Sequence, residues 1–353
     1  MERVFMKGNE AIAEAAIRCG CRFFFGYPIT PQSDIPEYMS ANLPKVGGVF
    51  VQPASEVAVS NMIGGAGATG ARVMTSSSSV GIAHMQENLS NLAACGVPVV
   101  VVNMSRGGPG VGNLSPNQGD YNQATRGGGN GDYHLIVLSP SSVQEACDLV
   151  QLAFDLAEKY RNPAMILSDA MIGQMMEAVE IHQVTPPPCD KSWCLKGYDP
   201  EKGPRAVVQS LFFTEENARN AILAMQAKYE KLAKEDTRWE EIDTEDAEYL
   251  IVAHGIAARL AFAALDMLKE ENIRVGMIRP ITLYPYPYEA VLRAAAQKSV
   301  KKVICVEMST GQMLQDVKIG VNGVKPIELF SRVGGFLPMP EEIAEFILRL
   351  EGK

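Results

Sequence analysis

The chain has 353 residues, of which 47% are hydrophobic and 21% are charged, a composition typical of a globular protein with a sizeable core. At roughly 100–200 residues per domain, this length predicts two domains. The net charge of −9 argues against a nucleic acid or an anionic membrane as the main partner. The N-terminus carries no apolar signal region and no uninterrupted apolar stretch of about 18 residues occurs, so we expect a cytoplasmic protein.

Short apolar runs alternate with helical patterns in the first half of the chain. The predicted strands cover residues 21–28, 47–52, 71–77, 97–104, 134–140 and 163–170, and the predicted helices include 9–20, 55–67, 82–96 and 141–160. Hydrophobic strands that alternate with helices favour a mainly parallel sheet covered on both faces. We therefore predict a first α/β domain over residues 1–183.

The composition changes at residue 184. Residues 184–205 are rich in Pro, Lys and Asp, which is typical of an irregular connector. Residues 214–247 are charged and helical in pattern, which predicts a solvated helix that packs one apolar stripe on its neighbours. The whole segment 184–247 is thus predicted to connect two domains.

A second α/β unit is predicted over residues 248–353. Its strands are expected at 248–255, 272–280, 301–309 and 325–332, and its last helix at 341–352. The predicted fold class is therefore α/β, with two open, mainly parallel sheets.

The thiols and imidazoles form no recognisable metal motif. The seven cysteines are odd in number and include no Cys-x-x-Cys pair, so the spacing of four-thiolate zinc or iron–sulfur sites is not met. We expect reduced thiols and no metal ion in this chain. The four histidines lie far apart in sequence, and each is interpreted as structural.

Residues 65–70, GAGATG, match the pattern G-x-G-x-x-G. The dinucleotide-binding fingerprint requires a strand before the first glycine and a helix at the last. Here a helical pattern precedes the glycines and a predicted strand follows them. We therefore interpret these small residues as sites of close helix packing.

Polar residues follow several of the predicted strands. Thr30 lies in a turn bracketed by two prolines, hydroxyl side chains line the segment TSSSSVG at 75–81, and Arg106 begins the Gly-rich part of residues 105–120. The carboxyl ends of parallel strands share one edge of a sheet, where α/β proteins place their sites. The guanidinium of Arg106 would suit a planar carboxylate. The pattern alone leaves open a helix-cap role for Thr30 and the serines, and a surface position for Arg106.

Glu56 begins a run of small side chains, and the next acidic residue is Glu87. It follows the predicted strand 47–52 and therefore belongs to the same sheet edge. A lone carboxylate among small residues would be partly desolvated and well suited to hydrogen-bond a ring nitrogen. A first-turn Glu favoured by the helix dipole is the alternative that the pattern leaves open.

Together these motifs resemble those of one family. They look like the α subunit of 2-oxoacid:ferredoxin oxidoreductases of the 2-oxoisovalerate or 2-oxoglutarate type. The matching stretches of the first domain are GNEA (8–11), GYPITPQS (26–33), Glu56 with its helix, TSSSSVG (75–81), SRGGPG (105–110) and QGD (118–120). IRPITLYPYP (278–287) and VEMSTGQM (306–313) extend the resemblance into the second domain.

The resemblance implies a thiamine diphosphate enzyme whose first domain binds the pyrimidine ring and whose second domain is similar to the C-terminal domain of transketolase. Glu56 matches the glutamate that hydrogen-bonds the aminopyrimidine ring and so promotes loss of the thiazolium proton. Thr30 and Arg106 match positions that hold the carboxylate of the substrate. Positions beside the cofactor are matched by Pro28, Ile29, Ser78 and Ser79. The implied reaction converts a 2-oxoacid and coenzyme A into acyl-CoA, CO₂ and reduced ferredoxin.

The resemblance also implies partner subunits. The chain lacks a GDG motif followed by paired asparagines, and GNGD (129–132) is not that motif. A β subunit is therefore expected to bring the diphosphate site, Mg²⁺ and a [4Fe-4S] cluster. Small γ and ferredoxin-like δ subunits are expected to complete the enzyme.

The substrate is less well defined by the sequence. No additional Arg or Lys lies in residues 26–34 or 75–81 to pair a second carboxylate, which favours a branched-chain 2-oxoacid such as 3-methyl-2-oxobutanoate. The alternatives are 2-oxoglutarate or a broad range of 2-oxoacids, a non-redox thiamine diphosphate enzyme of the transketolase or decarboxylase kind, and a non-catalytic α/β scaffold.

Overall fold

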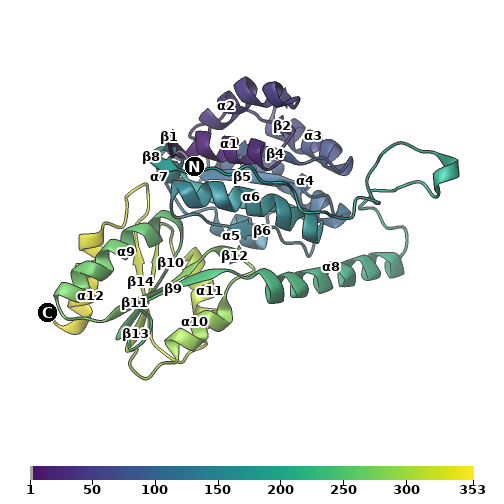
Figure 1. Cartoon of the computed structure of the whole chain (residues 1–353). Coiled ribbons are helices and arrows are strands. Elements are labelled where there is room, and N and C mark those ends of the chain that lie inside the picture. Colours follow the sequence, from purple (N-terminus) through teal and green to yellow (C-terminus); the bar gives the residue numbers. More distant parts are fainter. Residues whose placement is uncertain (1–2) are drawn as a thin grey trace.

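A seven-stranded sheet forms the centre of the first domain in the computed structural model, which describes residues 3–353 (Figure 1). The strand order is β12-β6-β7-β5-β4-β2-β3. These strands are β2 (Phe23–Phe25), β3 (Val49–Val51), β4 (Val73–Ser77), β5 (Val100–Ser105), β6 (Ile136–Leu138), β7 (Ala164–Asp169) and β12 (Thr282–Tyr284). All pairs are parallel except the antiparallel pairing of β12 with β6.

Helices cover both faces of this sheet, as predicted. One face packs against α1 (Gly8–Arg18), α2 (Asp34–Asn42) and α6 (Val143–Tyr160), and the other against α3 (Glu56–Ala68), α4 (Ser79–Cys95) and α5 (Tyr121–Arg126). Val100 and Val102 of β5 belong to the first apolar cluster and Val101 to the second. This alternation explains the continuous apolar run, because each side of the strand is buried.

Short elements border the first domain. They are η1 (Leu43–Val46), α7 (Ala170–Gln174) and an antiparallel pair of β1 (Val4–Lys7) with β8 (Met176–Val179). No helix within residues 3–353 combines the length and the apolarity that crossing a membrane requires.

The connector extends away from the first domain and includes η2 (Pro200–Lys202) before α8 (Glu215–Asp236) (Figure 1). Tyr229 and Leu232 of α8 are buried, which confirms the predicted apolar stripe. The prediction of helix up to residue 247 was wrong. The helix ends at Asp236, whose carboxylate accepts hydrogen bonds from Lys159 and from Tyr160, and β9 (Trp239–Ile242) follows as a strand paired with the second sheet.

The second domain has a five-stranded sheet in the order β14-β13-β10-β11-β9. Its strands β10 (Tyr249–Ala253), β11 (Val275–Pro280), β13 (Lys302–Glu307) and β14 (Ile327–Ser331) are parallel, and β9 is antiparallel. Its helices are α9 (Gly255–Glu270) and α12 (Pro340–Glu351) on one face and α10 (Tyr288–Ala295) and α11 (Gln312–Val321) on the other. The predicted fold class, two open and mainly parallel sheets, is confirmed.

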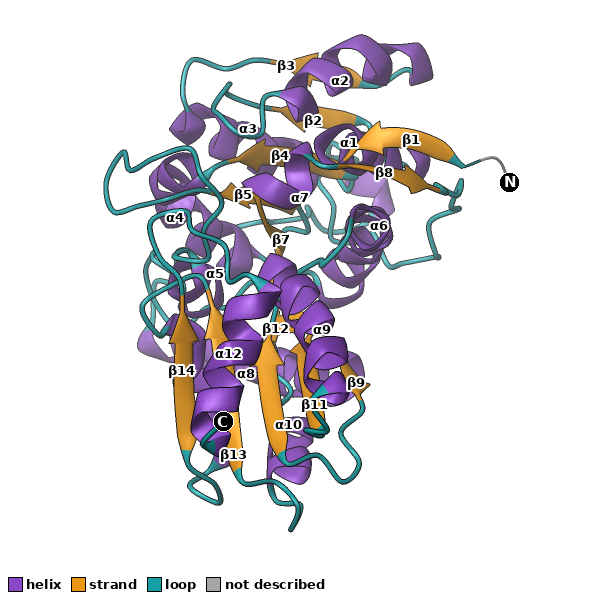
Figure 2. Cartoon of the chain, turned by 90° about the vertical axis from the view of Figure 1, so that its left-hand side faces the viewer, coloured by secondary structure: helices purple, strands orange, loops and turns teal. Residues whose placement is uncertain are grey.

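Sheet membership crosses the predicted ranges at two points. β12 lies within 248–353 but completes the first sheet, and β9 lies within 184–247 but completes the second. In Figure 2 the second sheet lies below the first domain, with its strands directed toward it. The chain between β11 and β12 thus passes from one sheet to the other within the motif at 278–287.

Arg279 in that motif holds the domains together. Its guanidinium donates two hydrogen bonds of 2.9 Å to the carboxylate of Glu145 at the start of α6, and its Nε donates to Glu240 of β9 at 2.8 Å. Paired bonds of this kind are strong because both partners are charged and the geometry is fixed.

Two of the glycines at 65–70, Gly67 and Gly70, pack closely against neighbouring segments, as predicted, whereas Gly65 has open space beside it. Most of them lie in α3, and a Cβ at Gly67 would be 2.8 Å from Cγ1 of Val97. The helix precedes these glycines and β4 follows them, so their role is packing and not phosphate binding.

We predict that Arg279→Ala lowers the free energy of unfolding by about 3 kcal/mol, because it leaves the Glu145 carboxylate without its cation. Arg293→Ala is the matched control, since Arg293 pairs with Glu241 but its side chain is 60% exposed, and it should cost only ~0–1 kcal/mol. Denaturant unfolding of the purified variants measures both changes. Equal losses in the two variants would contradict the role of Arg279 as one of the contacts that join the domains.

Candidate functional site

The loops that follow β2, β3, β4 and β5 meet at the carboxyl edge of the first sheet. Thr30, Glu56, the serines at 76–79 and Arg106 lie in or beside these four loops, respectively. Parallel pairing of these strands places the ends together, so the predicted site residues lie at one edge.

Glu56 is the first residue of α3 and is 7% exposed. Ser55 caps this helix, with its Oγ accepting a hydrogen bond from the N–H of Ala58. The carboxylate lies against Gly81 in the first turn of α4: a Cβ at Gly81 would be 2.8 Å from Oε1 of Glu56 and 2.1 Å from Oγ of Ser77. The carboxylate therefore lies in the first turn of a helix. It also occupies a space beside residue 81 that any residue larger than glycine would fill.

The serine run of β4 is fully buried. Oγ1 of Thr75 and the Oγ atoms of Ser77 and Ser78 have no hydrogen-bond partner, whereas Ser76 donates to the side chain of Gln32. Ser78 immediately precedes α4, but its side chain makes no capping hydrogen bond, so the helix-cap alternative is wrong for it. A buried unpaired hydroxyl costs about 1–3 kcal/mol, so these groups call for a hydrogen-bond partner such as an ordered water or a ligand.

Arg106 is buried, at 7% exposure, which rules out the surface position that the sequence left open. Its Nη1 donates to the backbone carbonyl of Thr30 at 2.8 Å and its Nη2 to that of Val111 at 3.3 Å, while its Nε has no partner. Its backbone N–H donates to Oγ of Ser79 at 2.9 Å. The structure therefore brings Thr30 and Arg106 together and leaves part of a buried guanidinium free.

The turn between β2 and α2 carries the remaining predicted residues. Pro28 and Thr30 are exposed and Ile29 is half-buried. α2 begins at Asp34 after Ser33, so Thr30 does not cap it, and that alternative is also wrong. Thr30 is thus exposed, and its contact with Arg106 is made through its backbone carbonyl.

A cavity of about 810 Å³ lies between the loops of the first domain and the second domain. From the first domain it is lined by Ser79, Val80, Ala83, His84, Gly108, Pro109, Gly110, Val111, Asn117, Gly119, Asp120 and Gln123, and from the second by Ser309, Thr310, Gln312, Val333 and Gly334. Ser79 lines it directly. Arg106 lies behind its Gly-rich segment and Glu56 lies next to His84.

His84 was missed by the sequence analysis, which took all histidines as structural. Its Nδ1 approaches Oε2 of Glu56 to 3.6 Å, and it lines the cavity. The contact between His84 and Glu56 arises because α3 and α4 are neighbouring helices whose N-terminal ends lie together. The prediction holds for His254, whose pKa burial lowers to about 3, and for His134, whose ring stacks on Tyr284.

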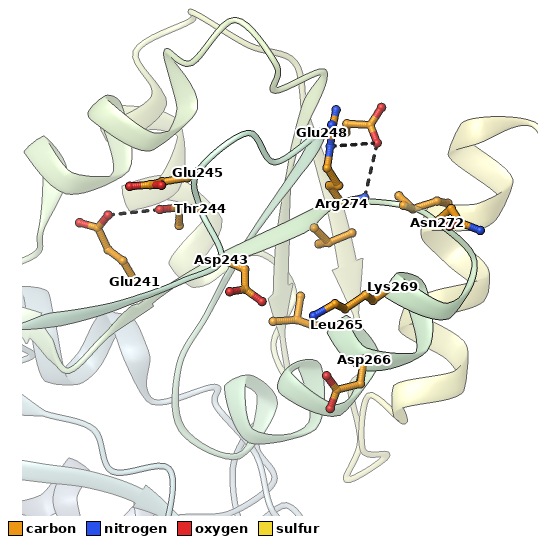
Figure 3. A pocket seen from close by; sticks show the side chains of 12 residues that line it. Glu241, Asp243, Thr244, Glu245, Glu248, Leu265, Asp266, Lys269, Asn272 and Arg274 are labelled. Atoms are coloured by element: carbon orange, nitrogen blue, oxygen red, sulfur yellow. Dashed lines mark hydrogen bonds and ion pairs between the residues drawn. The ribbon is translucent and has the colours of Figure 1, made fainter.

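A larger cavity, of about 1010 Å³, lies at the opposite end of the second sheet (Figure 3). Glu248 and Arg274 stand just before β10 and β11 and pair with each other there. Acidic side chains dominate the lining, and within residues 3–353 no group of three or more His, Cys, Asp or Glu residues is arranged to hold a metal ion. This cavity is remote from the predicted site residues.

Two open, mainly parallel sheets, with polar residues at the carboxyl edge of the first, form a transketolase-like fold. A split-gene transketolase chain shares this fold with a TM-score of 0.60, at 14% identity over 98% of this chain and 97% of that chain. A family model described as pyruvate flavodoxin/ferredoxin oxidoreductase, thiamine diphosphate-binding, matches residues 14–243, and one for core domain II of pyruvate:ferredoxin oxidoreductase matches residues 247–343. The chain belongs to this family of 2-oxoacid:ferredoxin oxidoreductases and is an oxidoreductase subunit.

Similar proteins support this membership over the whole length. The ketoisovalerate oxidoreductase subunit VorB of Methanothermobacter thermautotrophicus is 42% identical over 100% of this chain and 99% of its own. The 2-oxoglutarate synthase subunit KorA of the same organism is 36% identical over 99% of both chains. The structure of 2-oxoglutarate:ferredoxin oxidoreductase from Magnetococcus marinus, with 2-oxoglutarate, coenzyme A and succinyl-CoA bound, matches with a TM-score of 0.87 at 26% identity. That match covers 99% of this chain and 65% of that longer chain.

We predict that Gly81→Ala weakens thiamine diphosphate binding by about tenfold or more, because the added methyl group displaces the Glu56 carboxylate and Ser77. Fluorescence titration of the assembled complex with the cofactor measures this loss. Gly65→Ala is the matched control, since Gly65 lies in α3 with no atom within 4 Å of the added Cβ, and it should bind the cofactor normally. Normal cofactor affinity in Gly81→Ala would show that the space beside Gly81 does not bind the aminopyrimidine ring of the cofactor.

Proposed function

We propose that this chain is the α subunit of an oxidoreductase that converts a branched-chain 2-oxoacid and coenzyme A into acyl-CoA, CO₂ and reduced ferredoxin. The observation that carries the proposal is the convergence at one sheet edge of a buried carboxylate, unpaired buried hydroxyls and a buried guanidinium. The family supplies the reaction class, and the VorB relatives favour 3-methyl-2-oxobutanoate among the 2-oxoacids.

The residues at this edge fit the aminopyrimidine half of thiamine diphosphate. Bound there, the cofactor would supply a carbon nucleophile and an electron sink for the loss of CO₂. Glu56 would hold a proton shared with a ring nitrogen, and its position against Gly81 fixes where that proton lies. Ser78 and Ser79, with Pro28 and Ile29 across the edge, would line the ring, and the unpaired hydroxyl of Ser78 is free to bond it.

Arg106 and Thr30 would hold the carboxylate of the substrate. A buried guanidinium with a free Nε suits a carboxylate, because the bond is charge-assisted and water is excluded. The apolar part of the cavity lining would accept an aliphatic side chain: Val80, Ala83, Pro109 and Val111. Among the described residues that line the cavity none is Lys or Arg, which disfavours a second carboxylate.

Partner subunits would complete the site. The sequence lacks the GDG motif, so a β subunit would bring the diphosphate site, Mg²⁺ and a [4Fe-4S] cluster, and γ and ferredoxin-like δ subunits would pass electrons to ferredoxin in the cytoplasm. Three apolar side chains around the site are exposed and suit a covering partner: Val57, Val111 and Leu114. Exposed Val207, Leu211 and Phe213 make the connector a further contact surface.

Glu56→Gln should lower turnover by about 100-fold or more without changing subunit assembly, because the amide cannot hold the shared proton. Ferredoxin reduction and size-exclusion chromatography of the complex measure the two properties. Glu87→Gln, an exposed neighbour on α4, should retain full activity. Retained activity in Glu56→Gln would favour a non-catalytic scaffold.

The wild-type complex should use 3-methyl-2-oxobutanoate with kcat/KM about tenfold or more above that for 2-oxoglutarate, since the cavity offers an apolar wall and no cation for a second carboxylate. Steady-state kinetics with each 2-oxoacid, and iron quantified in the same preparation, test this. A preference for 2-oxoglutarate would refute the substrate assignment. Turnover without iron would favour a non-redox thiamine diphosphate enzyme.

A further inference from the structure

The segment QGD at residues 118–120 contacts both domains. Gln118 forms three hydrogen bonds with the second domain: its Nε2 donates to the carbonyl of His254 at 2.9 Å, its Oε1 accepts from the N–H of Met308 at 2.9 Å, and its own N–H donates to the carbonyl of Met308 at 3.2 Å. Gln118 is only 4% exposed. These bonds fix the segment to the carboxyl ends of β10 and β13.

Gln312, in the first turn of α11, holds the same segment one residue further on. Its Nε2 donates to the carbonyl of Gly119 at 2.7 Å, and its Oε1 accepts from the N–H of Asn122 at 2.8 Å. Both ends of this amide are therefore used to place Asp120, which lies between the two contacts. The second domain therefore helps to set the position of Asp120.

Asp120 faces the first domain at the sheet edge. Its Oδ2 accepts from Oγ of Ser79 at 2.7 Å and from Nδ2 of Asn103 at 2.9 Å. Ser79 in turn accepts from the backbone N–H of Arg106, and Oδ1 of Asn103 accepts from the N–H of Ser79 at 3.1 Å. The three side chains thus form one connected network directly behind Arg106.

The charge of Asp120 determines which groups of this network donate hydrogen bonds and which accept them. An ionised carboxylate can only accept, so Ser79 and Asn103 must both donate to it. Ser79 has a single hydroxyl proton, so its oxygen is left to accept from Arg106, and the amide of Asn103 is held with its oxygen toward Ser79. Without Asp120, Ser79 could donate instead to the carbonyl of Arg106, which lies 3.2 Å away.

We propose that Asp120 is a positioning residue for substrate binding, acting through Ser79 on Arg106, and that Gln312 transmits the position of the second domain to it. The inference rests on the proposed role of Arg106 in holding the carboxylate of a 2-oxoacid. Asp120 itself lines the cavity but is assigned no contact with the reacting atoms.

The test uses the complete complex with Asp120→Ala, Asp120→Asn, Gln312→Ala and Gln315→Ala. In Asp120→Ala, KM for the 2-oxoacid should rise about tenfold while kcat stays near the wild-type value, and the dissociation constant of thiamine diphosphate, whose ring Ser79 also lines, should rise by a smaller factor. Asp120→Asn keeps one acceptor oxygen, so its KM should lie much closer to the wild-type value than that of Asp120→Ala. Gln312→Ala should raise KM about three- to fivefold, whereas exposed Gln315 on the same helix should have no effect.

The possible outcomes separate the two proposals. Wild-type turnover with an unchanged KM in Asp120→Ala and Gln312→Ala would overturn the positioning role and leave the proposed function intact. A loss of cofactor affinity in place of a rise in KM would also overturn it, because the network would then serve the ring site. A wild-type complex that does not turn over 2-oxoacids would overturn both. Should Asp120→Ala fail to assemble, the KM values of Asp120→Asn, Gln312→Ala and Gln315→Ala still test the proposal. A KM in Gln312→Ala no higher than that in Gln315→Ala would overturn it.

Discussion

The parallel pairing of β2, β4 and β5 is the constraint on which the site depends. Side-by-side strands of the same direction end at one edge, so residues some 75 positions apart in sequence meet there. The contact between the guanidinium of Arg106 and the carbonyl of Thr30 is the direct product of this pairing. The pairing also brings together the first turns of α3 and α4, and with them Glu56 and Gly81.

Burial gives these groups their chemical value. A carboxylate, a guanidinium and several hydroxyls are held out of water, and some of their hydrogen-bonding capacity is unused. Buried groups of this kind bind strongly to a ligand that supplies the partners which the chain itself does not offer. The protein therefore contributes placement and a dry environment, while the chemistry of carbon–carbon cleavage belongs to the cofactor.

The sequence predicted the layered architecture well because most strands and helices have a hydrophobic periodicity of their own. The prediction was wrong for the elements whose structure depends on contacts with distant parts of the chain. β9 follows a charged helix without a break in composition, and β12 has only three residues, so neither carries a local signal.

The site was predicted largely through the resemblance. The sequence pattern alone could place Glu56 and Arg106 at one edge of the sheet, but it could not show that Arg106 is buried. His84 was missed because its partner lies 28 positions away on another helix.

The insertion of β12 into the first sheet has a consequence for how the chain is made. Until residues 282–284 leave the ribosome, β6 has no neighbour on its outer side, and its N–H and C=O groups form an open strand edge. At ordinary rates of translation this interval lasts on the order of ten seconds, long compared with the folding of most small domains. The nascent first domain thus keeps an open strand edge until β12 emerges, and its sheet is completed only after part of the second domain has been made.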